Sequence, residues 1–500
     1  MSVPQLTETP ATAGVSVPGP SPTPAAASES VNWPTLLVVL TGIFMSTLDI
    51  FIVNVAIPST QQELHASDSA VQWIVAGFGL AVAAGVITAG RLGDMFGRRR
   101  MFSLGLGLFT VASAACGFAP SASTLIGARV IQGLAAALLT PQVLAILGTA
   151  FRGRALTKAI TAYGLAMGLA AIFGQLIGGA LIQANLFGAG WRWCFLINVP
   201  VGIAAVTLVP KVVPESSLPQ RGRLDWTGTA LLTGALVAVV LPLIQGRQQG
   251  WPLWTGVSLA VGVLLLADFA WYERRITRSG REPLINLALF ADRAFSTGVL
   301  VQLVAFTGQL SFFLVLAVYL QNGVGLTPLR SGVLFIAIGA GYVVTATLSG
   351  SVAQRLGRQT VALGAAAMIG GLLLIDAGIH RIGAGAGTGS VLWLVPGLIV
   401  DGAGMGLIIA PMTSLVLARV APSHVGTASG VLSTVTQLGG ALGVALIGII
   451  FYGRIGHPRS TAIRTLGDAF TSSSYLLIAI AAAVLIGIQL LPRRPRVSAS

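Results

Sequence analysis

Long apolar runs recur along almost the whole chain, and they constrain its fold more than any other feature. Each is about twenty residues long, and a helix of that length at about 1.5 Å per residue crosses a hydrocarbon layer of about 30 Å. The runs lack strand-like alternation, and backbone groups in lipid must be satisfied within the spanning segment, so we expect helices. The mean hydropathy of +0.86 agrees with this. The sequence therefore predicts an all-α polytopic membrane protein.

We expect fourteen membrane spans, at approximately residues 35–57, 70–90, 101–119, 123–148, 158–183, 193–211, 226–246, 253–272, 295–320, 331–350, 359–379, 391–415, 425–452 and 472–492. Residues 1–32 are rich in Pro, Ala, Ser and Thr and have too little apolar content for a core, so a disordered tail is expected there. A short basic tail, 493–500, follows the last span. An even number of spans puts both termini on the same side of the membrane.

The basic residues are divided unequally between the two sides. Of the 29 Lys and Arg residues, we assign twenty-one to segments on the side of the termini, seven to the other side, and Arg129 to the inside of a span. In membrane proteins the cytoplasmic loops carry the excess of Lys and Arg. We therefore expect a multi-pass protein of the inner (plasma) membrane with both termini in the cytoplasm. Because the basic residues form no patch, the net charge of +14 predicts no nucleic-acid partner.

The charged segment Gly90–Arg98, GRLGDMFGR, has a related segment, Gly350–Arg358, at an offset of 260 residues. The first and ninth spans begin at the same offset. We therefore expect two six-helix halves, 33–211 and 295–492, each with a charged turn after its second helix. Residues 212–294 between them supply two extra helices. Internal duplication of this kind is typical of transporters that move two halves around a central site.

Five segments together resemble the motifs of the major facilitator superfamily and, more narrowly, of its fourteen-helix drug:proton antiporters. They are LDIFIVNVAIP (Leu48–Pro58), GRLGDMFGRRR (90–100), ARVIQGLAAALLTP (Ala128–Pro141), WRWCFLINVPVG (Trp191–Gly202) and PLINLALF (Pro283–Phe290). The resemblance implies the major facilitator fold and an exporter of amphipathic drugs, antibiotics or dyes. It also implies alternating access driven by the proton gradient, without a cofactor.

The charged turn after the second span contains four candidate residues. Gly90 and Gly97 permit a tight, close-packed turn. Asp94 can accept backbone N–H bonds near the start of the next helix and pair with Arg98 four residues later. The resemblance implies that this cluster latches the two halves in the outward-facing state. The alternative is that the arginines only set the topology and face anionic lipid.

Ionisable residues inside spans are costly, so each is a candidate for function. Asp49 lies near the middle of the first span and Asn54 about one and a half turns later. A carboxylate there could exchange a proton or pair with a cationic substrate. By resemblance, Arg129 is the fourth-span arginine linked to proton movement, which would act by tuning a neighbouring carboxylate because a guanidinium stays protonated. Asp401, in the twelfth span, is a second candidate for proton coupling or substrate binding.

Each of these residues also has a structural interpretation, in which hydrogen bonds hold it for packing alone. For Asp401, the neighbouring glycines would let the carboxylate bond to backbone. Polar and aromatic residues in other spans are weaker candidates for lining a cavity, namely Phe44, Trp73, Gln302, Gln309, Phe312 and Gln437.

The fifth span departs from the family pattern. Antiporters of this family typically carry Gly-Pro followed two residues later by Gly-Gly, whereas this chain has Gly174-Gln175 before Gly178-Gly179. Glutamine does not kink a helix as proline does, so we expect a straighter helix. We expect the Gln175 amide to hydrogen-bond across the interface between the halves or to reach into the cavity. The alternative is that glutamine is a tolerated replacement for proline, with no effect on proton coupling. The small residues predict close packing against the other half.

The remaining patterns argue against an enzyme. No Walker A, HExxH or GxSxG sequence occurs, so neither a built-in ATPase nor a hydrolase is expected. Cys116 and Cys194 suggest neither a disulfide framework nor a metal site. We expect a monomer whose partners are a small amphipathic substrate, protons and the lipid bilayer. Two alternatives remain, an exporter dedicated to one endogenous metabolite and a receptor or scaffold of the same fold that does not transport.

Overall fold

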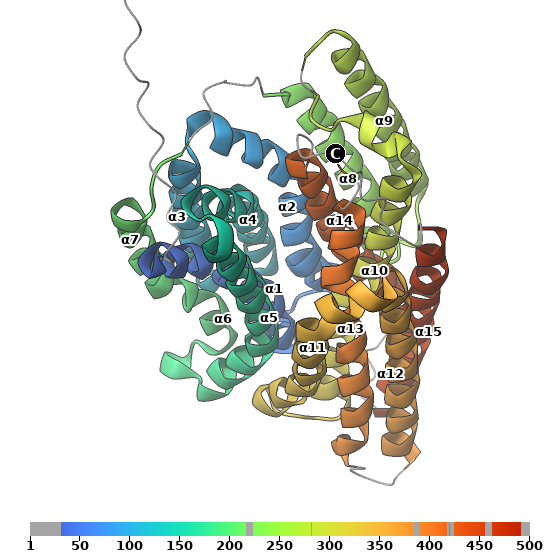
Figure 1. Cartoon of the computed structure of the whole chain (residues 1–500). Helices are drawn as coiled ribbons and strands as arrows, with labels where there is room; N and C mark the ends of the chain where they lie inside the picture. The colour runs from blue at the N-terminus through green and yellow to red at the C-terminus, as the bar shows by residue number, and fades with distance from the viewer. Residues whose placement is uncertain are drawn as a thin grey trace, which may run out of the picture.

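The computed structural model describes residues 32–216, 224–281, 283–384, 390–417, 420, 425–455 and 463–491. Within these residues, fourteen helical segments are long and apolar enough to cross a membrane, which confirms the predicted number (Figure 1). The tails expected at 1–32 and 493–500 lie outside the described residues, apart from residue 32.

The helices are α1 (Trp33–Glu63), α2 (Asp68–Phe96), α3 (Arg98–Gly117), α4 (Ala122–Ala150), α5 (Gly153–Ala184), α6 (Trp193–Leu196), α7 (Asn198–Val212), α8 (Trp226–Gln245), α9 (Leu253–Arg278), α10 (Arg293–Val318), α11 (Pro328–Leu356), α12 (Gln359–Ala384), α13 (Val395–Leu417), α14 (Val425–Ile455) and α15 (Ile463–Gly487). The short α6 and α7 follow each other within one span.

Several helices extend beyond the predicted spans because polar caps, and not the apolar runs, set their ends. Ser67 caps α2 by accepting the Ala70 N–H at 3.2 Å. Ser121 and Thr124 form a capping box at the start of α4. At its other end α2 continues through the charged segment to Phe96, beyond the predicted span end at Gly90.

The helices before and after α8–α9 form two groups that meet along three helix pairs, α1 with α10, α2 with α14 and α5 with α11 (Figure 1). The extra helices α8 and α9 pack on each other, and α8 contacts both α2 and α14. The additional pair therefore lies beside the seam between the two groups.

The seam is closely packed at one end of the bundle. A Cβ at Gly179 of α5 would lie 2.4 Å from the Pro328 carbonyl oxygen of α11. Nearby, the Gln321 Nε2 donates to the Val55 carbonyl oxygen of α1 at 3.0 Å. Small residues let helix backbones approach this closely in membranes. The two groups are therefore in direct backbone contact at this end.

The duplicated turn is present in both groups. Gly97, between α2 and α3, has a φ of +104°, and Gly357, between α11 and α12, has a φ of +56°. These positive angles favour glycine because other residues would bring Cβ into contact with backbone. The offset of 260 residues in the sequence thus relates two turns that each contain a glycine with a positive φ.

Candidate functional site

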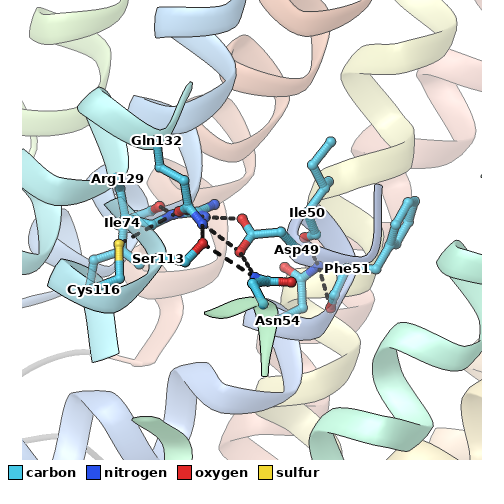
Figure 2. Close-up of polar contacts among 10 residues, drawn as sticks. Asp49, Ile50, Phe51, Asn54, Ile74, Ser113, Cys116, Arg129 and Gln132 are labelled. Carbon is cyan, nitrogen blue, oxygen red and sulfur yellow. Dashed lines mark hydrogen bonds and ion pairs between the residues drawn. The ribbon is translucent and has the colours of Figure 1, made fainter. Parts of the chain in front are cut away.

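Asp49 of α1 is fully buried and accepts hydrogen bonds from three side chains (Figure 2). Arg129 Nη1 pairs with its Oδ2. Gln132 Nε2 donates to its Oδ1 at 2.8 Å, and Asn198 Nδ2 donates to the same oxygen at 3.3 Å. Gln132 Nε2 also donates to Ser113 Oγ at 2.8 Å. We call these five residues, contributed by α1, α3, α4 and α7, the Asp49 cluster.

Arg129 is 1% exposed and is held by more than its ion pair. Its Nε donates to the Ile74 carbonyl oxygen at 3.0 Å, and its Nη1 donates to Gln132 Oε1 at 2.7 Å. The guanidinium carbon lies 4.4 Å from the centre of the Phe78 ring and 5.7 Å from that of Phe195. A buried charge needs such partners to offset the loss of hydration. The predicted neighbouring carboxylate for Arg129 is thus Asp49.

Asn54 does not join this cluster, contrary to its grouping with Asp49 in the sequence. Its Nδ2 donates within its own helix, to the carbonyl oxygens of Ile50 at 3.3 Å and Phe51 at 3.4 Å. The separation of about one and a half turns places the two side chains on different faces of α1.

Three members of the Asp49 cluster were not identified from the sequence. Gln132 carries a usable signal, because it lies three residues after Arg129 on the same helix face. Asn198 lies in a motif segment, as the polar residue within LINVP. Ser113 has no signal in the sequence that distinguishes it from other small residues of its span.

A central cavity of about 450 Å³ lies between the two groups of helices. This volume is within the range of pockets for drug-sized ligands. Among the described residues its lining contains no Asp, Glu, Lys, Arg or His. Its polar and aromatic lining residues come from both groups and include Ser46, Thr47, Phe51, Phe78, Thr140, Tyr163, Gln302, Phe306, Gln309, Phe313, Phe335, Tyr342 and Gln437.

The predicted lining residues have mixed outcomes. Gln302, Gln309 and Gln437 line the central cavity, as expected. Phe44 and Trp73 are absent from its lining, so those two predictions are wrong. Residue type alone does not show which face of a helix is turned to a cavity. Phe312 is absent as well and lines a second, smaller cavity of about 30 Å³, whose lining also includes Asp401.

Phe78 separates the central cavity from the Asp49 cluster. Its side chain lines the cavity and also lies next to the Arg129 guanidinium. Asp49 itself does not line the cavity, although Thr47 and Ile50 on the same helix do. The charged pair and the cavity are therefore adjacent but separated by an aromatic ring.

Asp401 of α13 is fully buried and lies apart from the Asp49 cluster, in the other group of helices. Neither carboxylate oxygen has a hydrogen-bond partner among the described residues. The alternative interpretation, in which glycines let Asp401 bond to backbone, is therefore wrong. Instead the glycines pack helices closely, since a Cβ at Gly402 would lie 2.0 Å from the Ile338 carbonyl oxygen of α11.

In the charged turn, Asp94 and Arg98 form the expected ion pair at 2.9 Å. The role predicted for Asp94 in capping the next helix belongs to Glu215, whose Oε1 accepts the Arg99 N–H at 3.1 Å. Glu215 follows α7 and is invisible to local sequence patterns, because it lies more than a hundred residues away. Its carboxylate also pairs with Arg99 at 3.6 Å and Arg100 at 3.7 Å.

The two glycines of this turn differ. A Cβ at Gly97 would lie 2.7 Å from Glu215 Oε1. Gly90, by contrast, lies inside α2, and the nearest atom to its Cβ would be 3.9 Å away on Pro141. The expectation of a close approach at Gly90 is therefore wrong, because the helix does not turn there.

The fifth-helix residues contact two different helices. Gly174 and Gly178 pack on α1 of the same half, so the expected packing against the other half is wrong for this pair. Gly179 packs on α11, as expected. Gln175 is fully buried, but its amide atoms have no hydrogen-bond partner among the described residues and it does not line either cavity. The hydrogen bond or cavity contact predicted for Gln175 is therefore also wrong.

Comparisons with known proteins agree on the family to which this chain is related. A family model described as the Major Facilitator Superfamily matches residues 39–444 and 298–500. The "Probable actinorhodin transporter" of Streptomyces coelicolor is 38% identical over 86% of this chain and 74% of that protein. The "Tetracenomycin C resistance and export protein" of Streptomyces glaucescens is 36% identical over 85% and 77%. The "Puromycin resistance protein pur8" of Streptomyces alboniger is 34% identical over 91% of each chain.

Solved structures share the fold at low identity. A peptide transporter POT in complex with sulfate covers 93% of this chain and 98% of its own, with a TM-score of 0.65 and 15% identity. A D-xylose-proton symporter covers 93% and 99%, with a TM-score of 0.63 and 15% identity. The family match, the relatives and the fold lead to one conclusion. The chain belongs to the major facilitator superfamily and is related to its fourteen-helix drug efflux proteins.

Proposed function

We propose that the protein exports amphipathic small molecules from the cytoplasm by alternating access, driven by the proton gradient. The observation that carries this proposal is the uncharged, aromatic central cavity, which lies directly beside a buried carboxylate and arginine pair. Phe51 of one half packs edge-on against Phe313 of the other, with ring centres 5.2 Å apart. Such a surface suits aromatic compounds with dispersed polar groups.

In this proposal the Asp49 cluster couples proton movement to the conformational change. Protonation of Asp49 removes the charge that attracts Arg129, and so weakens the link between α1 and α4. Because α1 also carries the cavity-lining Thr47 and Ile50, a shift of this helix would be felt by the bound substrate. The moving bodies would be the halves 33–211 and 295–492, and the Asp94–Arg98 turn would stabilise the outward-facing state.

We propose an orientation with both termini in the cytoplasm, on the charge asymmetry of the sequence, and this orientation is the one that export requires. The cavity lining extends to Leu144, near the end of α4, and to Leu417, the last residue of α13. These helix ends lie on the side of the Gly97 turn, opposite the close contact between Gly179 and Pro328. With that side in the cytoplasm, the cavity would receive substrate from the cell interior.

A second candidate, an exporter dedicated to one endogenous metabolite, is favoured by the names of two relatives. One is described as an actinorhodin transporter and another as a tetracenomycin C resistance and export protein. A growth screen in an exporter-deficient host separates the candidates. Resistance to several unrelated aromatic compounds supports a multidrug exporter, and resistance to a single compound supports a dedicated one.

Transport itself is tested in everted membrane vesicles loaded with a pH-sensitive dye. Addition of a substrate identified in the screen should release protons from acidified vesicles, and a collapsed proton gradient should stop substrate accumulation. No proton movement and no accumulation with any compound would contradict the proposal. It would favour the receptor or scaffold alternative.

A further inference from the structure

Two acidic side chains meet where the extra helix α8 begins and α9 approaches its end. Asp225 caps α8, and its Oδ1 accepts the Gly228 N–H at 2.8 Å. Glu273 lies on α9, and its Oε2 accepts the Ile285 N–H at 3.3 Å. Neither acid lines the central cavity or contacts the Asp49 cluster. We call the two residues the Asp225–Glu273 pair.

The second oxygens of the two carboxyl groups converge on one point. A Cβ at Gly228 would lie 2.5 Å from Asp225 Oδ2 and 2.7 Å from Glu273 Oε1. The two side chains lie within hydrogen-bonding reach of each other. Yet neither of these two oxygens has a hydrogen-bond partner among the described residues. Because position 228 carries no side chain, the two acids can face each other directly.

Burial makes this arrangement costly for two negative charges. Asp225 is 7% exposed and Glu273 is 0% exposed. Neither acid belongs to any ion pair among the described residues. Two carboxylates in contact repel each other, and here neither water nor a basic side chain offsets the repulsion, so they do not both stay ionised. A proton on one of the facing oxygens removes the repulsion and forms a hydrogen bond to the other.

A proton fits the pair better than a metal ion does. Mg²⁺ and Ca²⁺ take six or more oxygen ligands, whereas the pair offers two free oxygens that already lie close together. Among the described residues, no group of three or more His, Cys, Asp or Glu side chains could hold a metal ion. One proton, by contrast, satisfies both oxygens at once, because a protonated carboxyl group donates and the carboxylate accepts.

Few other charged or titratable groups lie near the pair. Tyr272 Oη donates to Asp225 Oδ1 at 3.0 Å. The helix α8 and the turn Leu287–Ala291 contain no charged residue. The only charged residue of α14 is Arg454, in its last turn, and the part of α14 before it packs on the first turns of α2. The other charged residues of α9 are exposed, namely Asp268, Arg274, Arg275 and Arg278.

The pair is connected to the charged turn between α2 and α3. Ile285, which donates to Glu273, follows Pro283 by two residues, and the Pro283 carbonyl oxygen accepts a hydrogen bond from Arg91 of α2. Arg91 belongs to the charged segment Gly90–Arg98. Residues 283–285 therefore bridge the end of α9 and the charged segment.

We propose that Asp225 and Glu273 share one proton, in a second proton-binding site that is separate from Asp49. The shared proton holds the start of α8, the end of α9 and residues 283–285 together. When it is lost, two facing anions repel each other, and the contact of residues 283–285 with Arg91 is loosened. The extra helices thus respond to the pH on the side of the charged turn. This inference does not depend on the central cavity or on the direction of transport.

Infrared spectroscopy of the purified full-length protein in lipid tests the shared proton, because a protonated carboxyl group has a C=O stretching band that a carboxylate lacks. The variants are Glu273→Gln and Asp225→Asn. Each removes one acid and leaves an amide that can donate to the remaining carboxylate, and Asn is also a good N-cap. Glu63→Gln is the matched control, since the Glu63 carboxylate has a basic partner in Arg192.

At pH 7 each pair variant should lack one carboxyl band that the wild-type protein and Glu63→Gln both show. A band of wild-type intensity in Glu273→Gln would mean that the pair holds no proton. The same result in Asp225→Asn would mean that Glu273 holds a proton without sharing it. A band that appears in the wild type only after a metal chelator is added would assign a bound metal ion. Each of these three results would overturn the inference.

Hydrogen exchange of the segment 283–290, followed by mass spectrometry from pH 6 to pH 9, tests the mechanical consequence. After correction for the intrinsic exchange rate, opening in the wild type should increase with pH, by up to about ten-fold per pH unit, because opening releases the shared proton. Glu63→Gln should behave in the same way, and Glu273→Gln should show no such increase. An equal pH dependence in the wild type and Glu273→Gln would contradict the proposed link.

Discussion

At the scale of single residues, one carboxylate ties three helices together. Asp49 of α1 receives Arg129 and Gln132 from α4 and Asn198 from α7. The change Asp49→Asn keeps the shape but removes the titratable charge, so we expect proton-driven export to be lost. The measurement is dye uptake into inverted proteoliposomes under an imposed pH gradient. Asp376→Asn, which changes a buried acid of α12 that lines neither cavity, serves as the control and should transport at the wild-type rate.

An Asp49→Asn variant could also lose transport because it does not fold. A melting curve in detergent distinguishes loss of folding from loss of proton coupling. An Arg129 without its carboxylate partner would lower the free energy of unfolding by about 3–5 kcal/mol, yet the variant should still give a cooperative transition. Export at the wild-type rate between pH 6 and pH 8 would rule out Asp49 as the coupling residue.

The second residue-scale prediction concerns Phe78, whose ring lies 4.4 Å from the Arg129 guanidinium and lines the cavity. Phe78→Ala should admit water from the cavity to the Asp49–Arg129 pair, because it removes the ring that separates them. We expect a proton leak in proteoliposomes without substrate, measured with a trapped pH indicator. Phe51→Ala enlarges the same cavity but does not change the surroundings of Arg129, so proteoliposomes with this variant should not leak protons. Equal leaks in both variants would contradict the barrier role.

The sequence identifies Asp49 and Arg129 because a charge inside an apolar span is conspicuous. It does not show that they pair, because pairing depends on which faces of α1 and α4 meet. The same limit explains why Asn54 was grouped with Asp49 although it bonds within its own helix. Uncharged members such as Ser113 become recognisable only when several helices bring them to one point.

At the scale of elements, the turn between α2 and α3 depends on one of its two glycines. Gly97 has a φ of +104° and sits against Glu215, whereas Gly90 is helical and a Cβ there would make only an ordinary van der Waals contact with Pro141. Gly97→Ala should destabilise the protein by about 1–3 kcal/mol through backbone strain. Gly90→Ala should be neutral or slightly stabilising. Thermal unfolding of the two variants in one detergent tests this pair, and equal melting temperatures would refute it.

Helix α5 contains a buried glutamine whose amide atoms have no partner among the described residues. Gln175→Leu should therefore stabilise the protein, by about 1–2 kcal/mol, because an apolar side chain of similar size removes an unsatisfied group. Gln142→Leu is the matched control, since Gln142 Nε2 donates to the Ala89 carbonyl oxygen at 2.8 Å and its loss should destabilise. A lower melting temperature for Gln175→Leu would show that the amide has a partner after all.

Helix number and type follow from the apolar runs, but helix ends do not. The charged residues after Gly90 stop the hydropathy signal, yet α2 continues to Phe96 because these residues have polar partners. Arg91 donates to the Pro283 carbonyl oxygen, and Asp94 pairs with Arg98. Likewise, the glycines of α5 predict that another helix packs closely against α5, but they do not show which helix that is. Gly174 and Gly178 are turned to α1, while Gly179 is turned to α11.

At the scale of the whole molecule, duplication and hydropathy predict the fold class, because lipid restricts the chain to spanning helices. The cavity is different. Its volume and lining depend on how two groups of helices are tilted against each other, and no local pattern encodes that. This is why the three glutamines were placed correctly by residue type, while Phe44 and Trp73 were not.

The last prediction concerns the orientation of the whole molecule, on which the direction of transport depends. The charge asymmetry predicts that the Gly97 turn lies in the cytoplasm. Both cysteines, Cys116 and Cys194, are buried, so a single introduced cysteine can be labelled against a low background. Arg100, with 73% of its side chain exposed, lies beside that turn, and Phe187, 95% exposed, lies beyond the far end of α5.

A membrane-impermeant maleimide should label Phe187→Cys in intact cells, whereas Arg100→Cys should react only after the membrane is permeabilised. The cavity extends toward Leu417, on the side of Arg100, so this result places its accessible end in the cytoplasm, as an exporter requires to collect substrate. The reverse labelling pattern would put that end outside the cell. The same cavity and the same Asp49–Arg129 pair would then support uptake instead of export.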